Sequence, residues 1–246
     1  MQHFKVFLSA FFLLIVTVAS AQKTITESFS KVVVSPYIQV TFVQGDQESV
    51  TINDIDVDTS KLHIEVTDNT LRIYLEGAKD FPKNEKDYSN GYKETYPLYS
   101  KTSVEATITY KTLEAISLRG EEDHICEGPI NGDRFSLKMY GESNVVLNEV
   151  NLQQLSATLY GEGTLEIKAG TVIDQKYTCY GEGRINSLAI EGNTGRLTAY
   201  GTADFNVNVS ERIKITSFGD AKVHYKGNPQ IDKGLHFGDM VINKID

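Results

Sequence analysis

Residues 159–167 read LYGEGTLEI, and 20 positions later residues 179–187 read CYGEGRINS. The same unit recurs from residue 118 to the end of the chain, as an aromatic or basic residue, a glycine, and an acidic residue or threonine. The repeated glycines are Gly120, Gly141, Gly161, Gly181, Gly201, Gly219 and Gly238. Their spacings of 21, 20, 20, 20, 18 and 19 residues indicate one structural unit of about 20 residues.

Apolar or small residues alternate on both sides of each glycine. They occupy the positions four and two residues before it, as in Ala157 and Leu159, and four and six residues after it, as in Leu165 and Ile167. Such alternation predicts two short strands per unit, each with one face inward. Stacked units bury a continuous core, so we predict an all-β fold, a single-stranded right-handed parallel β-helix, or β-solenoid. One unit of about 20 residues is called a coil below.

The segments before the clear repeat also alternate. Residues 28–78 contain several strand-like stretches separated by turn residues, and we expect either degenerate coils of the same solenoid or a cap on its N-terminal end. Residues 79–103 break the pattern with charges, tyrosines and two prolines, so they are expected to be an inserted loop, either functional or disordered. Residues 104–110 then lead into the regular glycine coils of 118–246.

The first 21 residues have the pattern of a secretory signal peptide. Lys5 precedes an apolar run over 6–18, and Ala19-Ser20-Ala21 is a cleavage motif. Residue 22 is not cysteine, which argues against a lipoprotein anchor. We therefore expect residues 22–246 to form one exported domain in the periplasm, at the cell surface or outside the cell. No transmembrane segment is expected after the signal peptide.

The charge of the chain argues against one class of partner. The formal net charge is −9, and nucleic-acid binding relies on clusters of Lys and Arg, so a nucleic-acid partner is not expected.

The two cysteines are expected to stay unpaired. Export would favour a disulfide between Cys126 and Cys179. The repeat instead places them two to three coils apart, roughly 10–14 Å along the axis, which is beyond the reach of a disulfide. We predict two buried free thiols.

The chain resembles the head GIN domain family, also called putative auto-transporter adhesins, which is common in Bacteroidetes and has no established function. The resemblance rests on the serial glycine coils and on residues 29–34, 43–45, 69–73, 113–120 and 223–229. It implies an exported β-solenoid, sometimes described as adhesin-like or pectinase-like, and it supplies no catalytic residue. The Tyr-Gly-Glu-Gly turns stand where Ser-Gly-Ser-Gly is commoner, and residues 79–103 look like an insertion.

The repeat creates an aromatic column. Its members directly precede the glycines: Tyr140, Tyr160, Tyr180, Tyr200, Phe218 and Phe237. They are one position out of register with the inward residues, so we expect an outward-facing ladder. Such a ladder either stabilises the solenoid by cross-strand packing or offers a flat platform for sugar rings or a partner protein.

An acidic column directly follows the glycines. It contains Glu121, Glu142, Glu162, Glu182, Thr202, Asp220 and Asp239. Stacked like charges either extend into water or share cations such as Ca²⁺. The calcium-binding nonapeptide motif of other solenoids is absent from the sequence, so a solvated turn is expected, with no metal and no cofactor.

Three functions stay open: a binding or adhesion module, a glycan-active enzyme and a structural envelope protein. Neighbouring carboxylates in a ladder have the spacing of a retaining glycosidase pair by construction, and the motifs of β-helical polygalacturonases are absent apart from Arg212-Ile213-Lys214. We therefore expect no enzyme. We expect a binding module for a glycan or cell-surface protein, with binding residues Tyr140, Tyr160, Tyr180, Tyr200, Glu142, Glu162 and Glu182.

Overall fold

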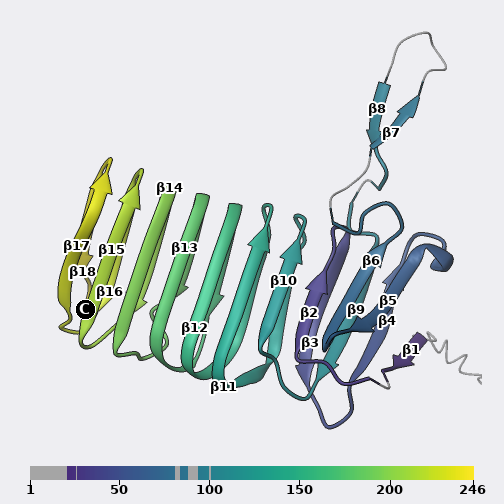
Figure 1. The fold of residues 1–246 in the computed structure, drawn as a ribbon, viewed down its shortest axis with the longest axis horizontal. Helices are drawn as coiled ribbons and strands as arrows, with labels where there is room; N and C mark the ends of the chain where they lie inside the picture. The colour runs from purple at the N-terminus through teal and green to yellow at the C-terminus, as the bar shows by residue number, and fades with distance from the viewer. Residues whose placement is uncertain (1–20, 26, 81–83, 88–93, 100) are drawn as a thin grey trace, which may run out of the picture.

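The computed structural model describes residues 21–80, 84–87, 94–99 and 101–246, apart from residue 26. Nearly all of its strands join one 16-stranded sheet that winds into a solenoid (Figure 1). The expected signal peptide lies outside the described residues except for Ala21. The predicted β-solenoid is confirmed.

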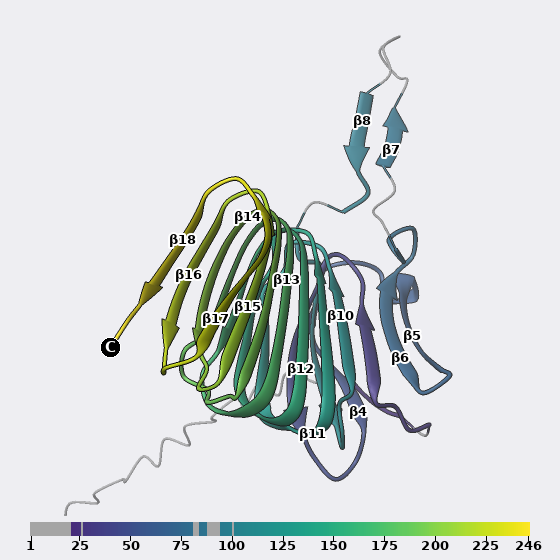
Figure 2. The ribbon, with the colours of Figure 1, turned by 60° about the vertical axis from the view of Figure 1, so that its left-hand side comes forward.

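The C-terminal half consists of stacked parallel coils. Its strands are β11 (His124–Tyr140), β12 (Asn144–Ile167), β13 (Gly170–Ser187), β14 (Thr194–Asn208), β15 (Arg212–Phe218), β16 (Ala221–Lys226), β17 (Gln230–Phe237) and β18 (Met240–Lys244). Each coil pairs with the next in parallel, and equivalent repeat positions are aligned, as in Tyr160 with Tyr180 and Tyr180 with Tyr200. Figure 2 shows successive coils following the same path one behind another.

The positions predicted to face inward form the core. Ala157, Leu159, Leu165 and Ile167 are all buried, and the equivalent residues of the coils from β10 to β16 are buried too, except that Tyr225 is half-buried. In the last coil, formed by β17 and β18, these positions are half-buried or exposed. Because each coil places its apolar residues directly above those of the next, the buried residues form one continuous cluster along the solenoid.

The glycine turns are the tightest part of each coil. Every glycine of the repeat has a positive φ, between 96° and 134°, a conformation that residues with a Cβ rarely adopt. A Cβ added to Gly181 would also lie 2.7 Å from the backbone oxygen of Gly161 in the preceding coil. The turn therefore requires glycine for two independent reasons, its backbone angle and the close approach of the next turn.

The N-terminal region contains both a coil and a cap. β2 (Lys31–Val34) and β3 (Ile38–Gln44) pair in parallel with β10 (Ala115–Arg119) and β11, as one more coil. β6 (Thr70–Leu75) pairs in parallel with β2, and β9 (Val104–Tyr110) pairs in parallel with β3. Three further strands pair antiparallel: β5 (Leu62–Thr67) with β6, β4 (Ser49–Ile55) with β9, and β1 (Ala21–Thr24) with β4. A short 3-10 helix, Thr59–Lys61, directly precedes β5. These antiparallel strands cover the end of the parallel stack.

The insertion was predicted to be a loop, and this is wrong for its described part. β7 (Asn84–Asp87) and β8 (Glu94–Pro97) form a two-stranded antiparallel sheet. The sequence of β7 has charges in place of apolar alternation, so nothing in its pattern indicates a strand. In Figures 1 and 2 the two strands project above the strands of the N-terminal region, clear of the coils.

The two cysteines are unpaired, as predicted. Cys126 in β11 and Cys179 in β13 are both buried and free. Burial raises the pKa of the Cys126 thiol to about 11 and that of Cys179 to about 12. Both side chains therefore remain protonated at neutral pH and act as small apolar core residues.

The glycine column generates a first prediction. Replacing Gly181 with alanine should lower the free energy of unfolding by at least about 2 kcal/mol, because both the positive φ and the contact with Gly161 are violated. Gly195→Ala is the matched control, since that glycine has no positive φ and a Cβ there would meet only side chains, at 3.3 and 3.6 Å. It should change stability by less than about 1 kcal/mol in urea unfolding. Equal effects of the two substitutions would contradict the role assigned to the turn.

A second prediction concerns acid. His124 is buried, and its Nδ1 accepts a hydrogen bond of 3.2 Å from the Val40 N–H, so the ring fits in its neutral form. Burial lowers its pKa to about 4, with the Asp123 carboxylate opposing this shift. In the unfolded chain the pKa is about 6.5, so between pH 6.5 and 4 the unfolded state binds more protons, and stability is lost as the pH falls.

His124→Asn keeps an acceptor and removes the titration. Between pH 7 and 4 the wild type should lose about 3 kcal/mol more unfolding free energy than this variant. The exposed His236→Asn provides the control and should follow the wild type. Parallel stability curves for the wild type and His124→Asn would show that His124 does not limit stability in acid.

Candidate functional site

The aromatic column forms a continuous stack on one face, as predicted. Tyr140, Tyr160, Tyr180 and Tyr200 stack with ring centroids 4.7, 4.9 and 4.7 Å apart and planes within 3° of parallel. Phe218 continues the stack at 5.2 Å, and Phe237 ends it at 5.7 Å with a tilt of 27°. These six residues are called the aromatic ladder below.

The ladder is exposed from Tyr160 to Phe237, and Tyr140 at its N-terminal end is half-buried. The exposed fraction is 36% for Tyr160, 39% for Tyr180 and 41% for Tyr200, and it reaches 60% for Phe237. The ring faces, however, are largely occupied by their neighbours in the stack. A ligand would therefore meet a strip of ring edges and phenol hydroxyls, with little of the flat ring face that the sequence suggested.

A threonine column runs beside the ladder. Thr158, Thr178, Thr198 and Thr216 lie two residues before the aromatic residue of their strands, so they occupy the neighbouring outward positions on the same face. All four are half-buried. The ladder is thus bordered by hydroxyl groups that repeat at the spacing of the coils. The sequence shows this column as a repeated Thr-x-aromatic pattern, although it was not singled out there.

The N-terminal end of the ladder is closed by charged residues. Arg119 occupies the ladder position in β10, with its guanidinium carbon 5.8 Å from the centre of the Tyr140 ring. Asp80, at the base of the insertion, forms ion pairs with both Arg119 and Arg72. The two guanidinium groups hold the pKa of the Asp80 carboxyl below its usual range. A hollow of about 750 Å³ lies here, lined by Asp80, Arg119 and Tyr140 among others.

The acidic column lies across the glycine turn from the ladder. Glu142, Glu162 and Glu182 are exposed and line a shallow hollow of about 520 Å³ together with Arg184 and Lys222. Arg184 pairs with Asp204 at 3.3 Å. Within the described part of the chain, no group of three or more His, Cys, Asp or Glu side chains is arranged to hold a metal ion.

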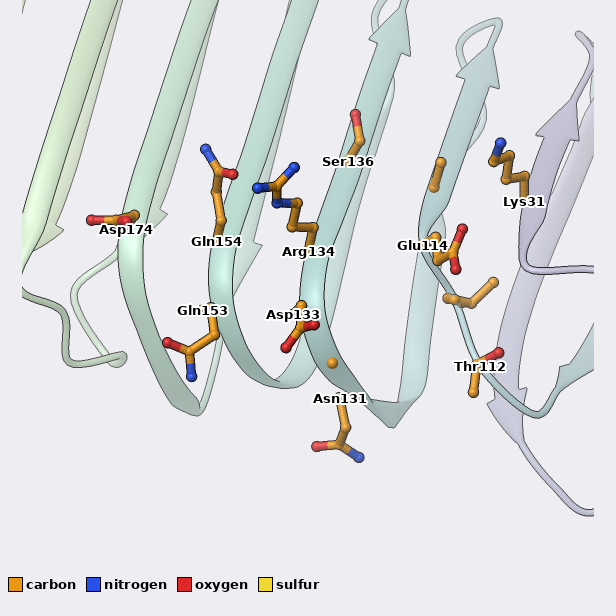
Figure 3. A pocket seen from close by; sticks show the side chains of 13 residues that line it. Lys31, Thr112, Glu114, Asn131, Asp133, Arg134, Ser136, Gln153, Gln154 and Asp174 are labelled. Carbon is orange, nitrogen blue, oxygen red and sulfur yellow. The ribbon is translucent and has the colours of Figure 1, made fainter.

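Sequence reasoning missed a groove on the ladder face. It has a volume of about 910 Å³ and lies across β2, β10, β11, β12 and β13, near the starts of β2, β10 and β13 and in the middle of β11 and β12 (Figure 3). Its labelled residues are Lys31, Thr112, Glu114, Asn131, Asp133, Arg134, Ser136, Gln153, Gln154 and Asp174. Figure 3 shows Arg134 beside Gln154 on the neighbouring strand, with Asp133 and Gln153 below them.

The fold is similar to several solved structures. A putative adhesin from Bacteroides fragilis superposes with a TM-score of 0.74 at 21% identity, covering 93% of this chain and 98% of its own. A putative adhesin from Parabacteroides merdae gives 0.64 at 18% identity, covering 93% and 96% of the two chains. A putative lipid binding protein from Parabacteroides distasonis gives 0.66 at 21% identity, covering 92% and 97%.

At these identities the structures share the fold, and none of them assigns a ligand to this chain. A search of curated proteins finds no match. The family model described as "putative auto-transporter adhesin, head GIN domain" matches residues 28–229, which is most of the chain. The chain therefore belongs to the head GIN domain family.

Proposed function

We propose that this chain is an exported, non-catalytic binding or adhesion module that holds a glycan on its aromatic ladder and acidic column. The observation that carries the proposal is the ladder itself, an unbroken aromatic stack over six coils that is exposed from Tyr160 to Phe237. Exposed apolar strips of this extent are typical of interaction surfaces, and tyrosine combines an apolar ring with a polar tip. A cell-surface protein is the alternative partner.

The form of the strip favours an extended ligand. Internal ladder rings give their faces to one another, so a single sugar ring cannot lie flat between them. A polymer running along the solenoid axis would instead meet equivalent ring edges and hydroxyls at every coil. Repeated weak contacts of this kind add up to useful affinity when they lie on one chain.

The comparisons support export and adhesion in general terms. The family and two of the similar structures carry adhesin descriptions. The leader-like residues 1–21 favour export to the periplasm or cell surface. No helix among the described residues has the length and hydropathy needed to span a membrane.

A glycan-active enzyme is the second candidate, because Glu162 and Glu182 line a hollow with Arg184. Retaining glycosidases need two carboxyl groups with different environments, one of them an acid kept protonated by burial. Here the glutamates of the column are all exposed, so none of them has the burial that would keep a carboxyl group protonated. No residue is set apart as the acid, so binding without turnover is the better account.

The ladder yields the third prediction. The double variant Tyr160→Ala/Tyr180→Ala removes the centre of the strip and should weaken binding to glycans retained by the wild type at least about tenfold, as loss of buried aromatic contacts does at other interfaces. Stability should fall by no more than about 3 kcal/mol, because three stacking pairs are lost and each contributes at most about 1 kcal/mol. A glycan array probed with residues 22–246 supplies the binding measurement.

Tyr96→Ala is the matched control, because Tyr96 is 50% exposed and lies outside the ladder. It should bind as the wild type does. Wild-type binding by the double variant, or no retained glycan at all, would favour the alternative in which the ladder only stabilises the solenoid.

A fourth prediction separates binding from catalysis. The purified chain should release no reducing ends from polygalacturonan, since the glutamates of the acidic column are all exposed and none is kept protonated by burial. Release that disappears in Glu162→Gln would establish the enzyme alternative in place of the binding module.

A further inference from the structure

The groove in Figure 3 lies on the same outer face as the ladder. On β12 the alternate residues Gln154, Ser156, Thr158 and Tyr160 share this face, leading from the groove to the ladder. From Ser136 to Tyr140 on β11 is four residues, or about 13 Å at ~3.3 Å per residue. One flexible polymer can therefore contact both features.

Small residues make the surface hollow at this point. Ala115 and Ser136 are in register on neighbouring strands, with Ser156 next, and Gly132 has no atom within 4 Å of where its Cβ would be. Longer side chains surround this floor, among them Lys31 at one end and Arg134 and Gln154 on one side. In the next three coils the floor position is filled by Lys176, Arg196 and Lys214, and the groove does not continue past β13.

The groove has unused hydrogen-bonding capacity. Elsewhere on the solenoid, outward polar residues pair between coils, as in Arg212 with Asp232 and Asn193 with Glu211. Arg134, Gln153 and Gln154 make no side-chain hydrogen bond or ion pair within the described chain, although Arg134 and Gln154 are in register. These groups are free to bind a ligand.

The chemistry of the lining points to a neutral, hydroxyl-rich ligand. Two cations, Lys31 and Arg134, stand among three anions, Glu114, Asp133 and Asp174, so neither sign dominates. Amide, guanidinium and carboxylate groups each offer two adjacent hydrogen-bonding atoms, which match the paired hydroxyls of a sugar ring. An anionic polymer would meet the acidic majority here and the net negative charge of the whole chain.

We propose that the groove is a second subsite for a neutral polysaccharide whose chain also crosses the aromatic ladder. The inference rests on the proposed glycan-binding function and adds the ligand class and a second contact region. Because both subsites hold one chain, binding at one raises the effective concentration at the other. Loss of the groove should therefore reduce affinity for polymers much more than affinity for short fragments.

Affinity electrophoresis of residues 22–246 tests this, with gels containing dextran, laminarin, galactomannan or arabinoxylan, and polygalacturonate as the anionic comparison. At least one neutral polymer should retard the wild type. Arg134→Ala/Gln154→Ala should then weaken binding to that polymer at least about tenfold. Competition by a disaccharide of the same sugar should be unchanged. Both residues are surface groups without partners, so stability should hardly change.

Arg212→Ala is the matched control, because Arg212 lies in the same outward column as Arg134 but outside the groove. It should bind as the wild type does. If Tyr160→Ala/Tyr180→Ala abolishes the retardation and Arg134→Ala/Gln154→Ala leaves it intact, the ladder binds the polymer and the groove does not. That result would overturn the second subsite and leave the proposed function standing. Retardation by polygalacturonate alone would overturn the ligand class. No retardation by any polymer would overturn both proposals.

Discussion

The close contact between successive glycine turns is the constraint on which the rest of the structure depends. Each turn has a positive φ, and from Gly141 onward each leaves no room for a Cβ beside the glycine oxygen of the preceding coil. Coils can therefore stack in only one register at the turn, glycine on glycine. The residues on either side of the turn are aligned as a consequence, which produces the aromatic column before it and the acidic column after it.

Under the proposed function, this alignment gives the ladder two roles that compete for the same atoms. Stacking at 4.7–4.9 Å uses the ring faces for the stability of the solenoid, so only edges and hydroxyls remain for a ligand. The threonine column and the groove extend the same face with further polar groups. A face built in this way suits a long, repetitive ligand better than a compact one, because no single point on it offers a deep pocket with convergent groups.

The repeat predicted the features that depend on local periodicity. The inward positions, the outward aromatic column and the separation of Cys126 from Cys179 all follow from counting residues around the glycines. The antiparallel strands at the N-terminal end could not be placed, because their partners are set by long-range pairing. Strands β7 and β8 lack apolar alternation altogether. The groove was missed because Lys31, Arg134 and Asp174 are distant in sequence and share no repeated residue type, so only the three-dimensional register brings them together.

Hydrogen exchange at the turn amides tests the central claim most directly. The N–H groups of Gly120, Gly141 and Gly219 donate to the carbonyls of Tyr140, Tyr160 and Phe237 in the next coil, at 2.8–2.9 Å. If the glycine turns lock the register, these amides should exchange as slowly as the amides at the centres of the strands, and they should do so together. Rapid exchange at the turns, with protection confined to the strands, would show that the turns are loose and that the register is set elsewhere.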